Sequence, residues 1–195
     1  VIKKTIYVYD SSAGEQTLNC LQKLGYPVKA VRMVKELPRN STLILAKNSW
    51  DDSLDNQSGQ LKEYVSKGGR IICLQQDATT FNQSWLPTSV EFLKDSNNDP
   101  VYLSPSLAYA DGMNINLERP YHPVFSGLTP KQFRLWSDYT SYNESKKGFP
   151  AIYPVDKGYD LRESGMENVA VLANYSRALA ATALSEMFMG EGSIL

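Results

Sequence analysis

The chain of 195 residues is long enough for one sizeable α/β domain with a substantial core. Its 20 basic and 21 acidic residues give a formal net charge of −1, which excludes the strongly basic surface of a nucleic-acid-binding domain. No apolar run approaches the ~20 residues of a membrane-spanning helix, so we expect no membrane span.

The chain holds only two cysteines and one histidine. Cys20 falls on the apolar face of an expected helix and Cys73 in an expected buried strand, so both are interpreted as small core residues rather than as a disulfide. Any histidine-based catalysis would depend on His122 alone. This composition argues against a metal site, and we expect no cofactor.

In the first half of the chain, apolar runs alternate with helical patterns. We expect strands over 6–9, 28–34, 42–46 and 71–74. Ser12 and Glu15 match a capping box at the start of the first helix, with the Ser12 hydroxyl capping and Glu15 reaching back, and Gly25 ends that helix. This alternation predicts a parallel, doubly wound sheet with right-handed crossovers.

The stretch from Gly68 to Asp77 lies at the centre of this pattern. A helix over 57–67 ends at Gly68, which suits the left-handed position just past a helix end. The apolar run 71–74 is continuous, as is typical of a strand covered by helices on both faces. Ligands of such sheets bind beyond the carboxyl ends of the strands. The candidate ligand-binding residues here are therefore Gln75, Gln76 and Asp77.

Polar and aromatic residues also follow the other strands. Asp10 and Ser11 lie between the first strand and its helix, a place that can bind anions, although helix capping is the simpler interpretation. Trp50 follows the third strand, and Trp85 and Trp136 occur later. Their rings could stack on sugars, but aromatic residues are also ordinary material for core and interdomain packing.

The second half of the sequence is more irregular and richer in β-structure. We expect a short helix or strand over 90–93, a compact turn over 121–128, and strands over 113–117, 151–155 and 169–174.

A β-hairpin closes the sequence. Residues 182–189 alternate weakly, and Gly190-Glu191-Gly192 supplies the positive φ values of a tight turn. We expect 193–195 to pair antiparallel with 182–189 on the β-rich side of the domain, and to fray because so short a strand makes few hydrogen bonds. The chain starts at Val1 without Met and stops within this apolar run, so we expect a piece of a longer polypeptide.

Several motifs together carry a family resemblance. They are Gly68-Gly69-Arg70-Ile71-Ile72-Cys73-Leu74, Trp85-Leu86-Pro87, His122-Pro123-Val124-Phe125-Ser126-Gly127-Leu128, Phe133-Arg134-Leu135-Trp136 and the Gly190-Glu191-Gly192 hairpin. In this order they resemble the class I glutamine-amidotransferase-like domain appended to glycoside hydrolases of the β-galactosidase type (family 2), and the related trehalose-utilisation (ThuA-like) domains. The resemblance implies one flavodoxin-like, three-layer α/β/α domain over 1–195, with the neighbouring domains of the same polypeptide as partners. For a bacterial glycoside hydrolase it also implies a periplasmic or secreted location.

The sequence departs from the catalytic members of that family. Those members use a Cys-His-Glu triad, with the cysteine on a glycine-flanked elbow between strand and helix. Cys73 instead lies inside the apolar run, and the elbow position near 75–77 holds no nucleophile. His122-Pro123 is followed by Val124 where catalytic members carry an acidic residue.

Three functions follow from this pattern. The first is a non-catalytic accessory domain of a carbohydrate-active enzyme, with a structural role or a role in shaping the substrate cleft. The second is an active hydrolase or amidotransferase-like enzyme that uses Cys73 and His122, for which a nucleophile would need an exposed thiol of lowered pKa. The third is a sugar-binding module that uses the tryptophans, in which carbohydrate would be a further partner.

Overall fold

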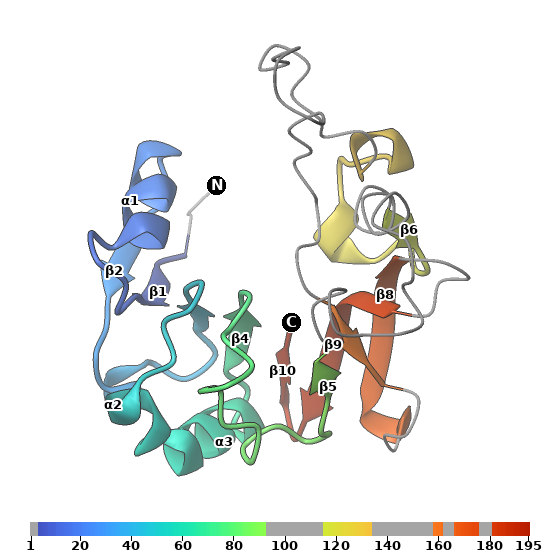
Figure 1. Ribbon diagram of the computed structural model, residues 1–195. Coiled ribbons are helices and arrows are strands. Elements are labelled where there is room, and N and C mark those ends of the chain that lie inside the picture. Colours follow the sequence, from blue (N-terminus) through green and yellow to red (C-terminus); the bar gives the residue numbers. More distant parts are fainter. Residues whose placement is uncertain (1–3, 93–114, 134–157, 162–165, 176–180) are drawn as a thin grey trace, which may run out of the picture. The chain divides into compact units, whose positions relative to one another are not determined.

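The computed structural model describes residues 4–92, 115–133, 158–161, 166–175 and 181–195 (Figure 1). The chain forms two compact units. The first consists of Val1–Ser89, Gly165–Val169 and Glu186–Leu195, and the second of Val90–Ser164 and Ala170–Ser185.

The first unit is built on a parallel sheet, coloured blue to green in Figure 1. β1 (Ile6–Tyr9) pairs on one side with β2 (Val28–Ala30) and on the other with β3 (Thr42–Leu45). β4 (Arg70–Cys73) pairs with β3. The order β2-β1-β3-β4 therefore reverses between β1 and β3, and all of these pairs are parallel, as the sequence predicts.

Helical segments connect these strands and cover their apolar side chains. They are α1 (Gln16–Lys23), the 3-10 helix η1 (Val34–Glu36), α2 (Asp52–Asp55) and α3 (Ser58–Ser66). Gly68 follows α3 with φ of 95°, in the left-handed position that the sequence predicts. The core of this unit includes Val8, Leu43, Leu45, Leu61, Val65 and Ile71.

The expected strand over 28–34 is wrong in length, because β2 ends at Ala30. The buried side chain of Gln57 takes the place of a strand partner beyond that point. Its Oε1 accepts a hydrogen bond from the Val34 backbone N–H at 2.7 Å, and its Nε2 donates to the Arg32 carbonyl at 3.0 Å. The backbone here is satisfied by a side chain and turns into η1.

The closing hairpin pairs as predicted but lies in a different place. β9 (Ala181–Met189) and β10 (Gly192–Ile194) are antiparallel, and β10 also pairs in parallel with β4. Leu195 extends this pairing, since its N–H donates to the Ile71 carbonyl and its carbonyl accepts from the Cys73 N–H, each at 2.8 Å. The expectation that this strand belongs to the β-rich side is therefore wrong, because it completes the first unit. The expected fraying of its end stays a prediction.

The second unit contains several antiparallel strand pairs. β5 (Glu91–Phe92) pairs antiparallel with β7 (Tyr159–Asp160), β6 (Ile115–Leu117) with β8 (Val169–Tyr175), and β7 with β9. β8 also pairs with β9. The 3-10 helices η2 (Pro123–Phe125) and η3 (Pro130–Phe133) follow β6, and η5 (Met166–Asn168) precedes β8.

The structure is thus α/β with mixed strand pairing and few helices. The turn expected over 121–128 contains η2, and the strand expected over 151–155 lies outside the described residues. Among the helices that the structure describes, none combines the length and the apolar character needed to cross a bilayer.

Candidate functional site

Asp10 follows β1 and is buried, with 2% of its surface exposed. Its carboxylate accepts backbone hydrogen bonds from Thr17 at 2.9 Å and Leu18 at 3.3 Å in the first turn of α1, and from the N–H and hydroxyl of Ser12. Burial raises the pKa of Asp10, but these hydrogen bonds outweigh burial and hold the pKa below its ordinary value. The place where an anion would bind is filled by the protein's own carboxylate.

The predicted capping box is wrong, because Asp10 provides the cap. Glu15 is the N-cap residue with φ of 45°, its side chain makes no capping hydrogen bond, and its carboxylate pairs with Arg32 at 2.9 Å. Ser11, another candidate, donates its hydroxyl to the Ser49 carbonyl at 2.9 Å. Ser11 therefore ties the loop after β1 to the loop after β3.

Gln76 is buried at the carboxyl end of β4 and uses its whole amide inside the fold. Its Oε1 accepts from the backbone N–H groups of Ser49 at 3.1 Å and Trp50 at 3.0 Å. Its Nε2 donates to the carbonyls of Ala46 and Leu74, each at 2.8 Å. Two donors and two acceptors exhaust the capacity of a carboxamide, so Gln76 joins the ends of β3 and β4.

The two neighbours of Gln76 are also engaged locally. The Gln75 carbonyl accepts from the Asn48 N–H at 2.9 Å. The exposed Asp77 carboxylate accepts from the N–H of Thr79 at 2.8 Å and from its hydroxyl at 2.7 Å, which is an Asx turn. The predicted ligand-binding trio thus shapes the loop after β4.

The tryptophans pack with Phe81. The Trp50 and Trp85 rings are stacked with centroids 6.0 Å apart, and Phe81 meets Trp50 edge-on at 4.9 Å. Trp85 is 1% exposed and Trp50 is 7% exposed, so neither offers an open ring face to a sugar. The Trp85 indole N–H has no hydrogen-bond partner in the described part of the chain. Trp136 lies outside that part.

The candidate catalytic residues have local roles in separate units. Cys73 is half-buried rather than fully in the core as the sequence predicts. Desolvation raises the pKa of its thiol to about 12, and its Sγ lies 3.6 Å from the Leu74 carbonyl oxygen. His122 accepts a hydrogen bond at Nδ1 from the Val124 N–H at 3.3 Å and so caps η2. Cys20 is exposed, and its predicted place in the core is wrong.

An open pocket of about 490 Å³ lies beside Trp50 in the first unit. It is lined by Trp50, Asp51, Asp52, Asp55, Thr80 and Asn82. Among the described residues, no group of three or more His, Cys, Asp and Glu side chains is placed to hold a metal ion. Besides the Trp50 ring, the lining has three carboxylates, one amide and one hydroxyl.

Internal hydrogen bonds position the acidic wall of this pocket. Asp51 is the N-cap of α2 and accepts at Oδ1 from the Leu54 N–H at 2.8 Å and the Tyr9 hydroxyl at 2.7 Å. Burial and this hydrogen bond to Asp51 raise the pKa of Tyr9 to about 12. Asp55 accepts from the Trp50 indole N–H at 3.3 Å.

Sequence reasoning found only Trp50 of the pocket-lining residues. A signal for α2 was present, since an aspartate followed by further acidic residues is typical of a helix start. Nothing in the sequence indicates that residues 80–82 lie beside α2, because their position depends on the path of the loop after β4.

No protein-family model matches the chain, and no curated protein matches it. Among solved structures, the exo-beta-1,4-mannosidase Op5Man5 from Opitutaceae bacterium strain TAV5 is similar over 99% of this chain, with a TM-score of 0.48 and 9% sequence identity. The matched region is 30% of that chain's length. We base no argument on a similarity of this degree.

Proposed function

We propose that the chain is a non-catalytic accessory domain of a carbohydrate-active enzyme, related to the class I glutamine-amidotransferase-like and ThuA-like domains. In this role it stabilises or orients neighbouring domains of the same polypeptide and helps to shape their substrate cleft. The observation that carries the proposal is Gln76, which occupies the strand end where a catalytic relative would hold its nucleophile and spends its whole amide on the backbone.

The state of Cys73 supports the non-catalytic role. A thiol with a pKa of about 12 is a thiolate in only about one molecule in 10⁴ at pH 8. The thiolate is the nucleophile, and catalytic cysteines lie in environments that lower their pKa. Cys73 has the opposite environment, and the imidazole of His122 already accepts a backbone hydrogen bond.

The order of the parallel strands supports the proposed relationship. Flavodoxin-like sheets begin with the order 2-1-3-4, and the first unit has the order β2-β1-β3-β4. The carbohydrate connection rests on the sequence motifs, from Gly68-Gly69-Arg70 to the closing hairpin.

Activity assays of the natural polypeptide that contains this chain test the proposal. We expect glycosidase activity on nitrophenyl glycosides that is unchanged by Cys73→Ala and by His122→Ala, with Cys20→Ala as the matched cysteine control. The isolated 195-residue chain should hydrolyse neither glycosides nor glutamine. A hydrolase or glutaminase activity that Cys73→Ala abolishes, or a polypeptide without glycosidase activity, would contradict the proposal.

A further inference from the structure

The pocket beside Trp50 lies outside the carboxyl ends of β3 and β4. Its lining residues Trp50, Asp51, Asp52 and Asp55 follow β3, and Thr80 and Asn82 follow β4. In open α/β sheets, ligands bind outside the carboxyl ends of the strands. The strand order reverses next to this place, between β1 and β3, and the hydrogen bond from the Tyr9 hydroxyl at the end of β1 to Asp51 positions one carboxylate of the pocket wall.

Several polar groups of this pocket have hydrogen-bonding capacity left over. Asp51 and Asp55 each use only one carboxylate oxygen, and the exposed carboxylate of Asp52 accepts no hydrogen bond from the described residues. On the opposite segment, Asn82 accepts at Oδ1 from the Ser84 N–H at 2.9 Å, which leaves its Nδ2 free to donate.

These groups select the chemistry of a ligand. Three carboxylates would repel a phosphate or another anion. A wholly apolar ligand would desolvate the carboxylates without giving them a hydrogen-bond partner. An organic cation would pair with the carboxylates but would leave the Asn82 amide unused. A hydroxyl group can donate to a carboxylate and accept from an amide at the same time.

We propose that this pocket binds a hydroxyl-rich ligand, a monosaccharide or short oligosaccharide, whose hydroxyls donate to Asp52 and Asp51 and accept from Asn82 Nδ2. Trp50 contributes a small exposed edge and not a stacking face. The inference goes beyond the proposed accessory role, since such a role requires no ligand of its own.

Calorimetric titration of the 195-residue chain with D-mannose, D-galactose and cellobiose tests this inference. We expect at least one sugar to bind with a Kd of about 1 mM and to change the tryptophan emission, because Trp50 lines the pocket. Asp52→Asn and Asn82→Asp each exchange an acceptor and a donor without changing shape. Each variant should weaken sugar binding about tenfold. Asp52→Asn removes a charged acceptor of a sugar hydroxyl, and Asn82→Asp removes a donor to one, and the loss of one such hydrogen bond has an effect of this size.

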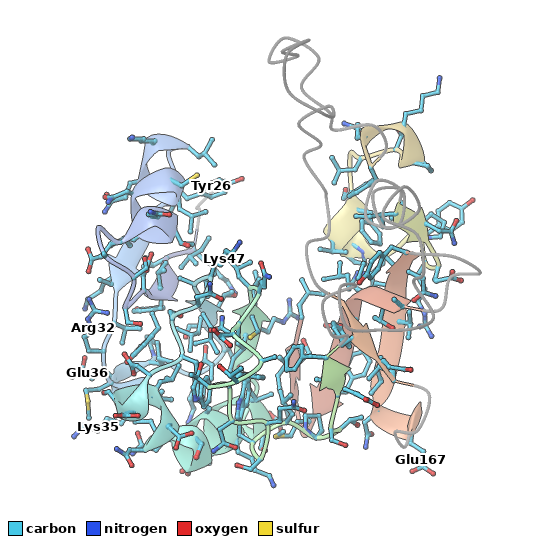
Figure 2. All side chains as sticks on the ribbon, viewed as in Figure 1. Tyr26, Arg32, Lys35, Glu36, Lys47 and Glu167 are labelled. Atoms are coloured by element: carbon cyan, nitrogen blue, oxygen red, sulfur yellow. The ribbon has the colours of Figure 1, made fainter. Side chains whose placement is uncertain are left out.

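Glu36→Gln is the matched control, because Glu36 is an exposed acid on η1 (Figure 2) and is not one of the pocket-lining residues. It should leave sugar binding unchanged, and circular dichroism should show that all three variants are folded. Binding of putrescine without binding of any sugar would overturn the inference, as would sugar binding that is insensitive to both pocket variants. A chain that binds none of the three sugars would also overturn the inference, but it would leave the accessory role standing, because that role is tested by the separate glycosidase assay.

Discussion

Three buried polar side chains, Asp10, Gln57 and Gln76, organise the strand ends of the first unit. Each satisfies backbone groups that no helix or strand partner reaches: the first turn of α1, the turn into η1, and the loop after β3. Buried backbone groups that lack partners cost free energy comparable to a lost hydrogen bond. These residues are therefore structural, although their polarity at the ends of strands and helices resembles that of ligand-binding residues.

Replacing Gln76 tests this structural role. Gln76→Ala removes the acceptor of the buried Ser49 and Trp50 N–H groups and a donor to the Leu74 carbonyl, whereas the Ala46 carbonyl keeps its hydrogen bonds from Ser49. We therefore expect a loss of about 2–4 kcal/mol in the free energy of unfolding. Gln60→Ala is the control, since Gln60 is exposed on α3, where alanine is favourable. Urea unfolding followed by circular dichroism measures both. If Gln76→Ala and Gln60→Ala were equally stable, the hydrogen bonds of the Gln76 side chain would not stabilise the fold as proposed.

The cap formed by Asp10 makes stability depend on pH. Folding lowers the pKa of Asp10, so the unfolded chain binds more protons in acid. The stabilisation is fully present above the unfolded pKa of about 4 and is lost as the pH falls through the folded pKa. Both carboxylate oxygens of Asp10 accept hydrogen bonds, so Asp10→Asn sets an NH2 group against backbone N–H donors. The substitution should cost about 1–2 kcal/mol at pH 7, and the difference from the wild type should shrink towards pH 3. Glu36→Gln, at an exposed acid, should show no such pH-dependent difference in urea unfolding.

The two cysteines should differ sharply towards a thiol reagent. Cys20 is exposed, whereas burial raises the pKa of the Cys73 thiol to about 12, so Ellman's reagent at pH 8 should titrate one thiol in the native chain and two after unfolding. Cys20→Ser should remove the native reaction and leave Cys73 to react only in denaturant. Rapid native labelling of Cys73 would restore it as a candidate nucleophile.

Sequence reasoning located these residues better than it assigned their roles. Asp10, Gln76 and Trp50 were correctly placed just after strands, because continuous apolar runs mark where buried strands stop. Whether such a side chain faces a ligand or a neighbouring loop depends on contacts between segments far apart in sequence. Cys20 shows the same limit. The helical pattern places it on an apolar face and predicts a core position, but the residue is exposed.

At the scale of elements, long apolar strands were predictable and pairing partners were less so. β1, β3 and β4 lie where the sequence predicts them, and β9 pairs with β10 around the predicted turn. The parallel pairing of β10 with β4 was not predictable, because it joins two segments with more than a hundred residues between them. The short helix α2 was missed because four residues carry too little periodicity.

A pair of glycines tests how tightly the hairpin fits against α3 and β4. A methyl group on Gly192 would overlap the carbonyl oxygens of Gly69 and Val65, which are backbone atoms that cannot rotate away. Gly192→Ala should therefore cost about 3 kcal/mol or more in the free energy of unfolding. Gly59→Ala on α3 meets no atom within 4 Å and should stabilise the chain by about 0.5–1 kcal/mol. Thermal unfolding that ranks Gly192→Ala at or above the wild type would contradict this packing.

At the scale of the whole molecule, the chain leaves the first unit at Ser89 and completes it only with Glu186–Leu195. The sequence pattern predicts the change from parallel α/β structure to irregular β-structure at about this point. It does not predict the return, because β10 has the composition of a hairpin strand in either unit. Its parallel pairing with β4, extended by the hydrogen bonds of Leu195 to Ile71 and Cys73, shows that it completes the first unit.

This return has a consequence for synthesis on the ribosome. Between Ser89 and Glu186 lie 96 residues, the difference between positions 186 and 89 less one. At translation rates of about 5–20 residues per second, roughly 5–20 s pass before β10 can emerge. During that interval the edge of β4 carries the unpaired N–H of Cys73 and the unpaired carbonyl of Ile71 next to apolar side chains, and an open strand edge of this kind favours aggregation. We therefore expect the nascent chain to need protection of this strand edge until β10 has emerged and paired with β4.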